Sequence, residues 1–314
     1  MCLGTMMFGT RCSEAESDRV LSDALDHGVN FVDTAAMYAN GETEAILGRI
    51  MRGRRAGLFL ATKVHRGLDA ASIESSIDDS LSRLQTDYVD LYLVHWPATG
   101  MRPVEVMEAL SRVVKAGKAR YVGGANFPAW LLAHSNAIAA EHGWPKLVNN
   151  QVAYNLFERG VEVEILPQAV AEKIAVTAYR PSAEGLLTGK YAPGSPLPAD
   201  SRGESSSLVL TWLSQYGESV ERFNLYAASL GVHPASLALA WVRFSDGVTS
   251  PIVGVSKISH LEAAYAGFAC DLTPQQYAEV TALFGTEVKE EGLQRFPGRK
   301  YNFPRLRRNL HLLG

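Results

Sequence analysis

The sequence lacks long hydrophobic runs and has few cysteines. No stretch reaches the roughly 18 consecutive apolar residues that a membrane-spanning helix needs. The three cysteines, Cys2, Cys12 and Cys270, are odd in number and widely spaced, so they do not form a disulfide framework. Residues 1–9 are apolar but carry neither the basic segment nor the cleavage site of a signal peptide. These absences predict a cytoplasmic protein in a reducing compartment, with no membrane partner.

An excess of charge and a metal-binding pattern are absent as well. The net charge is −3, which gives no reason to expect nucleic acid as a partner. No histidine or cysteine pair has zinc spacing, and the HExxH motif does not occur, so we expect no metal site. A hydrophobic content of 47% with 20% charged residues is ordinary for a globular enzyme.

Short apolar runs rich in β-branched residues alternate with longer segments of helical periodicity. The predicted strands are Cys2–Phe8, Val29–Ala35, Leu58–Val64, Val89–His95, Ala119–Ala125, Leu147–Ala153, Ile174–Tyr179 and Val248–Val253. Clear helical segments between them are Glu16–His27, Ile73–Leu84, Val104–Lys115 and Ala129–Glu141. Eight strands alternating with helices predict an α/β protein, a (β/α)8 or TIM barrel, in a single domain. A doubly wound sheet usually has fewer strands, about five or six.

Local signals mark several boundaries. Ser13 with Glu16 and Ser259 with Glu262 have the spacing of capping boxes, and Pro274 after Thr273 is typical of a first helical turn. Residues 192–207, rich in proline, glycine and serine, predict a long surface loop after the seventh strand. We expect a barrel over residues 1–272 and a C-terminal helix and tail over 273–314. The basic tail, residues 295–314, is interpreted as a packed or solvated extension, a lip of the active site or a subunit contact, which leaves a homo-oligomer open.

Four polar residues follow or end three consecutive predicted strands. Asp33, Lys63 and His95 stand at strand ends, and Tyr38 lies in the loop five residues after Asp33. Active sites of barrels lie at the C-terminal ends of the strands, so these four side chains are expected to meet at one mouth. Each taken singly also has an ordinary structural interpretation as a cap, turn or packing residue.

These residue types suit the reduction of a carbonyl group. Hydride addition builds negative charge on oxygen, which calls for a proton donor that is protonated at neutral pH, and tyrosine is one. A lysine beside Tyr38 is expected to lower the pKa of the phenol, and Asp33 to keep the lysine charged. His95 can hydrogen-bond and orient the carbonyl. The apolar residues Phe8, Met37, Trp96 and Phe127 predict either a substrate pocket or ordinary packing.

The chain resembles the aldo-keto reductase family along essentially its whole length, and its bacterial branch related to potassium-channel β subunits in particular. The motifs that carry the resemblance are Leu3–Gly9, Asp33–Ala35, Lys63, His95–Pro97, Gly124–Phe127, Asn150–Val152, Tyr179–Pro181, Gly185–Tyr191 and Pro251–Gly254. The resemblance implies Tyr38 as general acid, Asp33 and Lys63 as the residues that tune it, and His95 as the residue that orients the substrate, a small aldehyde or ketone.

The resemblance also implies a nicotinamide cofactor across the barrel mouth, with NADP(H) favoured over NAD(H). Tyr179 is expected to stack on the nicotinamide and Asn126 with Gln151 to hold its carboxamide. The full set of implied cofactor contacts is Gly4, Thr5, Met6, Asp33, Asn126, Gln151, Tyr179, Arg180, Pro181, Gly185, Leu187, Lys190, Arg202, Gly254, Ser256, Lys257 and His260. Independently of the resemblance, barrels commonly bind phosphate in the loops after strands seven and eight, which are residues 185–190 and 254–257 here.

The chain departs from the family pattern around the cofactor. Ala125 replaces the serine usual before the asparagine, and Arg180 replaces the serine of a Tyr-Ser-Pro pattern, where it either clamps the pyrophosphate or points outward. Ser256 and Lys257 occupy a region where many relatives carry arginine or lysine, and Ala263–Ala264 replaces Glu-Asn. Family members also place a hairpin before the first strand, whereas this sequence begins inside that strand, so the hairpin is absent or the start is internal.

Two other functions stay open from the sequence. One is an NAD(P)-dependent dehydrogenase of a sugar, an alcohol or pyridoxal, which runs the same chemistry in reverse. The other is a non-catalytic, nucleotide-sensing regulatory subunit like the channel β subunits. In those subunits the histidine position is typically asparagine, so His95 favours an enzyme.

Overall fold

Eight parallel strands close into a barrel in the computed structural model, which describes residues 1–64, 67–199, 201–204 and 206–285. The strands are β1 Cys2–Gly4, β2 Phe31–Asp33, β3 Phe59–Val64, β4 Val89–Val94, β5 Ala119–Ala125, β6 Leu147–Ala153, β7 Ala175–Tyr179 and β8 Ser250–Gly254. Each strand pairs with its neighbours in chain order, and β8 pairs with β1. The predicted (β/α)8 barrel is confirmed.

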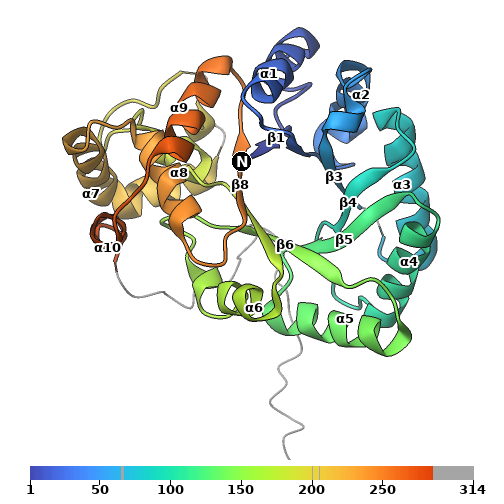
Figure 1. Ribbon diagram of the computed structural model, residues 1–314. Coiled ribbons are helices and arrows are strands. Elements are labelled where there is room, and N and C mark those ends of the chain that lie inside the picture. The colour runs from blue at the N-terminus through green and yellow to red at the C-terminus, as the bar shows by residue number, and fades with distance from the viewer. Residues whose placement is uncertain (65–66, 200, 205, 286–314) are drawn as a thin grey trace, which may run out of the picture.

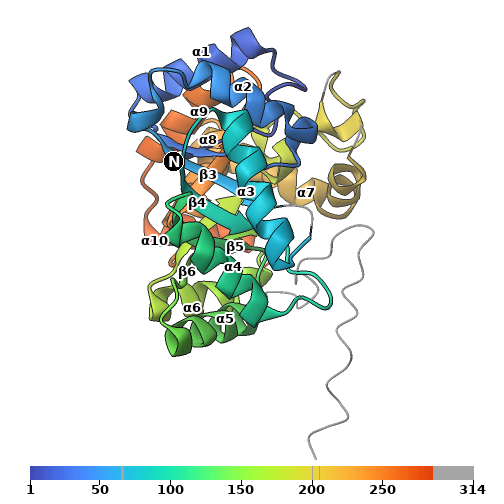
Figure 2. The same ribbon diagram turned by 90° about the vertical axis from the view of Figure 1, so that its right-hand side faces the viewer.

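The helices surround the strands in chain order (Figure 1). They are α1 Glu14–Asp26, α2 Glu42–Ile50, α3 Ala70–Leu84, α4 Pro103–Lys115, α5 Ala129–His142, α6 Ile165–Glu172, α7 Ser207–Ser229, α8 Pro234–Phe244, α9 Ile258–Ala269 and α10 Pro274–Ala282. Short 3-10 turns lie at η1 Tyr38–Gly41, η2 Arg55–Gly57, η3 Gly160–Glu162, η4 Ala183–Thr188 and η5 Arg202–Glu204. In Figure 2 the N-terminus lies on one side of the barrel and α7 on the opposite side.

Helix starts follow the capping signals at two places and not at a third. Ser13 and Glu16 form the predicted capping box at α1. Pro274 begins α10 after the N-cap Thr273, as predicted. The predicted box of Ser259 with Glu262 is wrong, because α9 already begins at Ile258 and has Lys257 as its N-cap. Backbone hydrogen bonds thus start this helix one residue before the serine could cap it.

The first strand is shorter than the sequence predicts. β1 ends at Gly4, and the backbone N–H and the hydroxyl of Thr5 still donate to the backbone oxygen of Asp33 in β2, at 3.0 and 2.9 Å. A turn then closes as the backbone N–H of Phe8 donates to the backbone oxygen of Thr5 at 2.8 Å. The chain then turns away from the sheet toward Phe8, which is buried in the core. The loop that the sequence predicts at 192–207 contains the 3-10 turn η5, and α7 begins at its last residue.

Between β5 and β6 the pairing register shifts from Val122 to Gly124. A side chain at Gly123 would lie 2.7 Å from Leu93 and 2.8 Å from the backbone oxygen of Asn149. The missing side chain therefore lets β5 approach both β4 and β6 at this irregularity.

The C-terminal part of the prediction is covered only in part. The helix expected near 273–283 is confirmed as α10. The basic tail, residues 295–314, lies outside the described residues, and the division of the chain at residue 272 stays a prediction. Within the described ranges no single helix is long and apolar enough to cross a membrane. Helices α7 and α8 reach that length and composition only together, with a bend of 94° between them.

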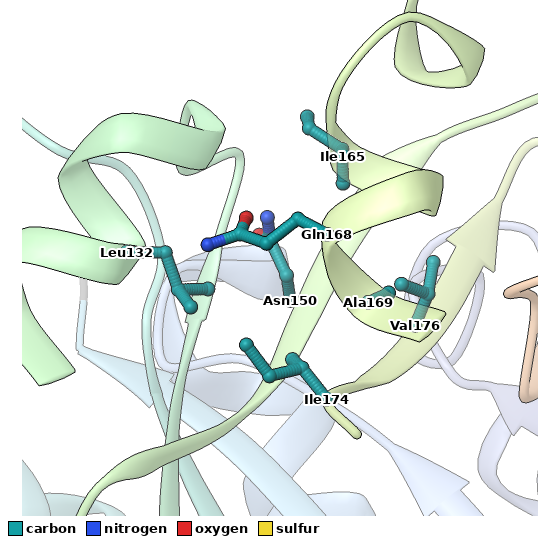
Figure 3. Close-up of a pocket in the computed structure, with 7 residues that line it drawn as sticks. All are labelled: Leu132, Asn150, Ile165, Gln168, Ala169, Ile174 and Val176. Atoms are coloured by element: carbon teal, nitrogen blue, oxygen red, sulfur yellow. The ribbon is translucent and has the colours of Figure 1, made fainter. Parts of the chain in front are cut away.

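A small gap lies away from the barrel mouth, between the helix layer and the sheet (Figure 3). Its lining comes from α5, α6, β6, β7 and the segment before β7, namely Leu132, Asn150, Ile165, Gln168, Ala169, Ile174 and Val176. The gap has no room for a water molecule. Gln168 donates across it to the backbone oxygen of Ala129 at 3.0 Å, so these residues join two helices and form no ligand site.

Candidate active site

Three adjacent strands bring the four predicted polar residues to one end of the barrel. Asp33 is the last residue of β2, Lys63 lies near the end of β3, and His95 directly follows β4. The register pairs Asp33 with Ala61 and Lys63 with Leu93, so each polar residue lies two positions beyond the residue that pairs with the polar residue of the preceding strand. Tyr38 begins the turn η1 after β2. The spatial grouping expected from the sequence is therefore present.

Lys63 and Asp33 form a buried ion pair. The lysine Nζ lies 2.7 Å from Asp33 Oδ2 and also donates to the backbone oxygen of Thr34 at 2.7 Å. Gln151 Nε2 donates to the other carboxylate oxygen, Oδ1, at 2.8 Å. Lys63 is completely buried and Asp33 almost so, so the two charges and their partners satisfy each other in a dry environment.

Tyr38 stands beside the lysine. The Nζ atom of Lys63 lies 5.1 Å from the centre of the Tyr38 ring, and the ring of His95 meets the Tyr38 ring edge to face at 6.1 Å. The turn that holds Tyr38 is tight, because the two residues after it, Ala39 and Asn40, both have positive φ. Tyr38 therefore begins a tight turn, and its ring lies next to both Lys63 and His95.

Two opposing influences act on the phenol of Tyr38. Burial raises the pKa of Tyr38, and Lys63 lowers it as expected but only in part, so the pKa lies above its ordinary value. Burial opposes the charge of Lys63, yet Asp33 and Tyr38 raise the pKa of the lysine above its ordinary value. At neutral pH the site therefore holds a protonated phenol next to a charged ammonium group.

Asn126 links the ends of four strands. Its φ is 64°, a left-handed conformation that asparagine tolerates. Its backbone N–H donates to Gln151 at 2.8 Å, its amide nitrogen donates to the backbone oxygen of His95 at 3.1 Å, and its amide oxygen accepts the hydroxyl of Tyr179 at 2.9 Å. Burial raises the pKa of Tyr179, so this hydroxyl stays a donor. The predicted residues Asn126, Gln151 and Tyr179 are thus neighbours.

Arg180 does not simply point outward, because its guanidinium group lies near two carboxylates. Its Nε lies 3.0 Å from Glu184, its guanidinium reaches Glu158 at 3.8 Å, and it lies 5.6 Å from the ring centre of Tyr179. Glu184 also accepts the hydroxyl of Ser206 at 2.7 Å. The arginine is therefore paired with two carboxylates beside the tyrosine, and Pro181 behind it is buried.

The loop after β7 has an unusual backbone. Arg180, Ala183 and Glu184 have positive φ, as does Gly185 at 92°. A side chain at Gly185 would lie 3.0 Å from the Nζ atom of Lys190, so the glycine lets the lysine fold over the loop. Leu187 is completely buried and anchors the turn.

Basic residues from three loops face one another at this end. Burial lowers the pKa of Lys190, as do the charges of Arg11, Arg202 and Lys257. Burial also lowers the pKa of Arg202, which Glu184 raises in part and Arg11 lowers. Cations held this close together are what a polyanionic ligand such as a dinucleotide requires.

The other predicted cofactor residues lie at the ends of β1 and β8. Gly4 pairs with Gly254 in adjacent strands, Thr5 is buried and Met6 is 40% exposed. The backbone N–H of Ser256 donates to His260 Nδ1 at 3.3 Å. Lys257 is exposed beside them. These residues are near one another in the structure, while their contacts with a cofactor stay a prediction.

Some residues near the mouth were not singled out in the sequence. Arg11, in the loop after β1, and Glu158, after β6, become neighbours of the site only through the fold. Glu184 stands four residues after Arg180, a spacing of opposite charges that could have signalled their pairing. Of the expected pocket residues, Phe8 and Phe127 belong to the core, whereas Met37 is 41% exposed.

The described residues contain no group of three histidine, cysteine or acidic side chains that could hold a metal ion. The cysteines Cys2, Cys12 and Cys270 are all free. The tyrosine, the buried ion pair, the histidine and the basic loops are the candidate functional groups at this end of the barrel.

Comparison with known proteins agrees with this geometry. The model of the aldo/keto reductase family matches residues 1–284. An uncharacterised oxidoreductase of Bacillus subtilis, YrpG, is 34% identical over 281 residues, which are 83% of this chain and 84% of the relative. Norsolorinic acid reductase B of Aspergillus parasiticus is 32% identical over 303 residues, 88% of this chain and 78% of the relative.

A probable voltage-gated potassium channel subunit β of Oryza sativa is 34% identical over 266 residues, 80% of this chain and 81% of the relative. The family covers reductases and channel subunits alike, which is the resemblance that the motifs indicate. The family match over residues 1–284, the closed barrel and the oxidoreductase relatives agree, and the chain belongs to the aldo-keto reductase family of oxidoreductases.

Proposed function

We propose that this oxidoreductase reduces small aldehydes and ketones to alcohols with NADPH, and that Tyr38 is the general acid. The observation that carries the proposal is the buried pair of Lys63 and Asp33, whose ammonium group faces the Tyr38 ring at 5.1 Å. A charged lysine kept in a dry site beside a phenol has a clear use when that phenol gives up its proton.

Proton delivery follows from the chain's own groups. The raised pKa of Tyr38 keeps the phenol protonated at neutral pH until negative charge develops on the substrate oxygen. The phenolate left behind lies next to the Lys63 cation, which stabilises it. Asp33 and the backbone oxygen of Thr34 hold the lysine in place throughout.

His95 is proposed to orient the carbonyl. Its ring is almost buried and meets Tyr38 edge to face at 6.1 Å, so a group bound between them touches both. The backbone oxygen of His95 accepts from Asn126, which ties the histidine to the next strand. Two groups held on adjacent strands can place an oxygen atom within reach of the acid.

The residues of the barrel mouth suit a nicotinamide dinucleotide, which when bound supplies the hydride. Tyr179 offers a ring, and Asn126 and Gln151 offer amides, at the end where the reaction would occur. Gly185, Leu187, Lys190 and Arg202 are proposed to hold the pyrophosphate. Arg180 and Pro181 border it. Gly4, Thr5, Met6, Gly254, Ser256, Lys257 and His260 would line the rest.

The preference for NADPH over NADH rests on the basic cluster. Lys190, Arg202 and Lys257 together with Arg11 concentrate more positive charge than a pyrophosphate alone needs. A third phosphate on the adenosine ribose balances that charge. The three free cysteines support a reducing, cytoplasmic location for the enzyme.

The reverse reaction, oxidation of a sugar, an alcohol or pyridoxal, uses the same groups with Tyr38 as base. A nucleotide-sensing role without turnover is the other candidate, favoured only by the similarity to the channel subunit. We expect the near-ultraviolet absorbance of NADPH to fall when para-nitrobenzaldehyde is added, faster than that of NADH. Binding of NADPH without any turnover of aldehydes, ketones or alcohols would leave the sensing role instead.

A further inference from the structure

Glu44 is a completely buried carboxylate between the barrel and its helix layer. It lies in the first turn of α2, and its Oε1 atom accepts the hydroxyl of Thr62 on β3 at 2.5 Å. Its Oε2 atom accepts Nε of Arg83 on α3 at 2.8 Å, and Nη2 of Arg83 lies 2.7 Å from the same oxygen. Both carboxylate oxygens are therefore bonded, and one side chain joins β3, α2 and α3.

The strand end of this bridge is next to the lysine of the candidate active site. Successive side chains of a strand point to opposite faces of the sheet, so Lys63 faces the barrel interior and Thr62 faces the helix layer. Lys63 accordingly contacts Asp33 inside the barrel. Thr62 is completely buried and contacts Glu44 on the outer side. The bond to Thr62 therefore holds the stretch of backbone that also carries Lys63.

The helix end of the bridge supports the turn that carries Tyr38. This turn, η1, runs directly into α2. After Tyr38 the φ angles of Ala39, Asn40 and Gly41 are 46°, 54° and 94°, a left-handed conformation that persists only where the surroundings hold it. A Cβ atom on Gly41 would lie 2.9 Å from Cδ and 3.0 Å from Nε of Arg83. The arginine that pairs with Glu44 thus lies directly against the turn.

Stability alone gives a buried ion pair little advantage over apolar packing. Removing two charges from water is costly, and well-packed apolar side chains in their place often leave a protein as stable or make it more stable. An arginine–carboxylate pair differs from apolar packing because its hydrogen bonds fix directions as well as distances. The elements that this pair fixes carry Tyr38 and Lys63, whose ring centre and Nζ atom lie 5.1 Å apart.

We propose that Glu44 is a positioning residue for proton transfer. Through Thr62 on one side and Arg83 on the other, it holds the turn of Tyr38 at a fixed distance from the ammonium group of Lys63. The phenol then gives up its proton in the orientation in which the lysine stabilises the phenolate. This inference rests on the proposed function, because it takes Tyr38 as the proton donor.

Four variants of the whole protein test the proposal. Glu44→Gln keeps the shape of the side chain and removes its charge, Thr62→Val removes only the hydroxyl group, and Thr62→Ser keeps the hydroxyl group. Asp90→Asn is the matched control. Asp90 is also a buried carboxylate, bonded to Arg55 and to the backbone N–H of Leu60, but it lies near the start of β4, at the opposite end of the barrel.

Turnover of para-nitrobenzaldehyde is measured per NADPH-binding site, with the sites counted by fluorescence titration. Because only folded protein binds the cofactor, a variant that is merely less stable keeps its turnover per site. Glu44→Gln and Thr62→Val are expected to lower this turnover about tenfold or more, since displacement of a reacting group by about 1 Å can cost about 100-fold. The dissociation constant of NADPH should stay within about threefold, because the cofactor is not contacted.

Thr62→Ser is expected to recover most of the turnover that Thr62→Val loses, and Asp90→Asn to keep the wild-type value per site. Wild-type turnover per site in Thr62→Val overturns the proposal, even where Glu44→Gln does not fold. An equal loss in Asp90→Asn also overturns it, because any buried carboxylate would then have the same effect.

Tyr38→Phe, measured beside these variants, separates the two claims. Wild-type turnover in Tyr38→Phe, or absence of NADPH binding in the wild type, contradicts the proposed function. Loss of turnover in Tyr38→Phe together with normal turnover in Thr62→Val overturns the positioning role of Glu44 and leaves the proposed function intact.

Discussion

The ammonium nitrogen of Lys63 lies 2.7 Å from Oδ2 of Asp33, and both side chains are almost completely shielded from solvent. Two charges in this setting are tolerable only as a pair, because each alone would lack its counter-ion in a region of low dielectric. The ion pair therefore holds both side chains in one conformation, and it keeps a positive charge beside Tyr38.

Replacement of Asp33 is expected to destabilise the fold as well as the site. Asp33→Asn leaves Lys63 buried with a charge that only neutral groups contact, which typically costs about 3–5 kcal/mol in the free energy of unfolding. Urea unfolding measures this. Asp271→Asn, at an exposed pair with Arg243, is the control and should change little. Equal stabilities for the Asp33 variant and the wild type would show that Lys63 does not depend on the carboxylate.

Arg180 is expected to stabilise the protein in a pH-dependent way. Burial raises the pKa of Glu158 and the charge of Arg180 lowers it, so Arg180→Ser raises it further. A carboxyl group whose pKa is higher in the folded than in the unfolded protein lowers the free energy of unfolding at pH values above its folded-state pKa. This loss of stability disappears as the pH falls toward the pKa that the group has in the unfolded protein. The variant should therefore lose more stability at about pH 8 than at about pH 5, relative to wild type.

The double variant with Arg180→Ser and Glu158→Gln supplies the control for this effect, because it lacks the carboxyl group of Glu158 while Glu184, the other partner of Arg180, is the same in both variants. Urea unfolding at the two pH values compares all three proteins. If Arg180→Ser lowers the stability equally at both pH values, then the loss of the Arg180 charge does not act through the titration of Glu158.

The architecture was readable from the sequence because each strand is a short buried run between amphipathic helices. All eight strands were placed within a few residues, and α1, α3, α4 and α5 likewise. The hydrophobic pattern does not predict where a strand or helix begins or ends when individual hydrogen bonds determine that point. A turn closed by the bond from Phe8 to Thr5 ends β1 early, and α9 begins ahead of the serine expected to cap it.

The site was predictable where it depends on strand ends and not where it depends on loops. Asp33, Lys63 and His95 follow from parallel strands that share one direction. The pairing of Arg180 with Glu158 joins two loops whose relative position no periodicity encodes. The sequence reveals the lysine that lowers the pKa of Tyr38, but it does not reveal the burial that raises this pKa by more.

Lys257 offers a test of cofactor preference. If Lys257 contacts the 2′-phosphate, Lys257→Ala should weaken the binding of NADPH about tenfold or more and leave NADH nearly unchanged, since charge-assisted hydrogen bonds contribute about 1.5–3 kcal/mol. Fluorescence titration with each cofactor measures both constants. Lys146→Ala, an exposed lysine just before β6, is the control. Equal weakening of both cofactors would refute the assignment.

Gly48 is expected to be required for the packing of α2 on α3. A Cβ atom there would lie 2.8 Å from the backbone carbon of Leu84 and 2.9 Å from its oxygen. Alanine favours a helix over glycine by about 1 kcal/mol, but overpacking against backbone costs about 1–3 kcal/mol. Gly48→Ala should therefore lower the melting temperature. Gly57→Ala, with open space around its Cβ, should not. A Gly48 variant as stable as wild type would show that the helices can move apart.

The central claim is that Tyr38 donates the proton while Lys63, Asp33 and His95 support it. The most direct measurement compares Tyr38→Phe with wild type for NADPH oxidation by an aldehyde and for NADPH binding. Loss of the proton donor is expected to reduce turnover by about 100-fold or more, the range for general acid catalysis. The dissociation constant should stay within about threefold, since one hydroxyl group is removed. Turnover that stays near the wild-type rate, with binding intact, would contradict the account.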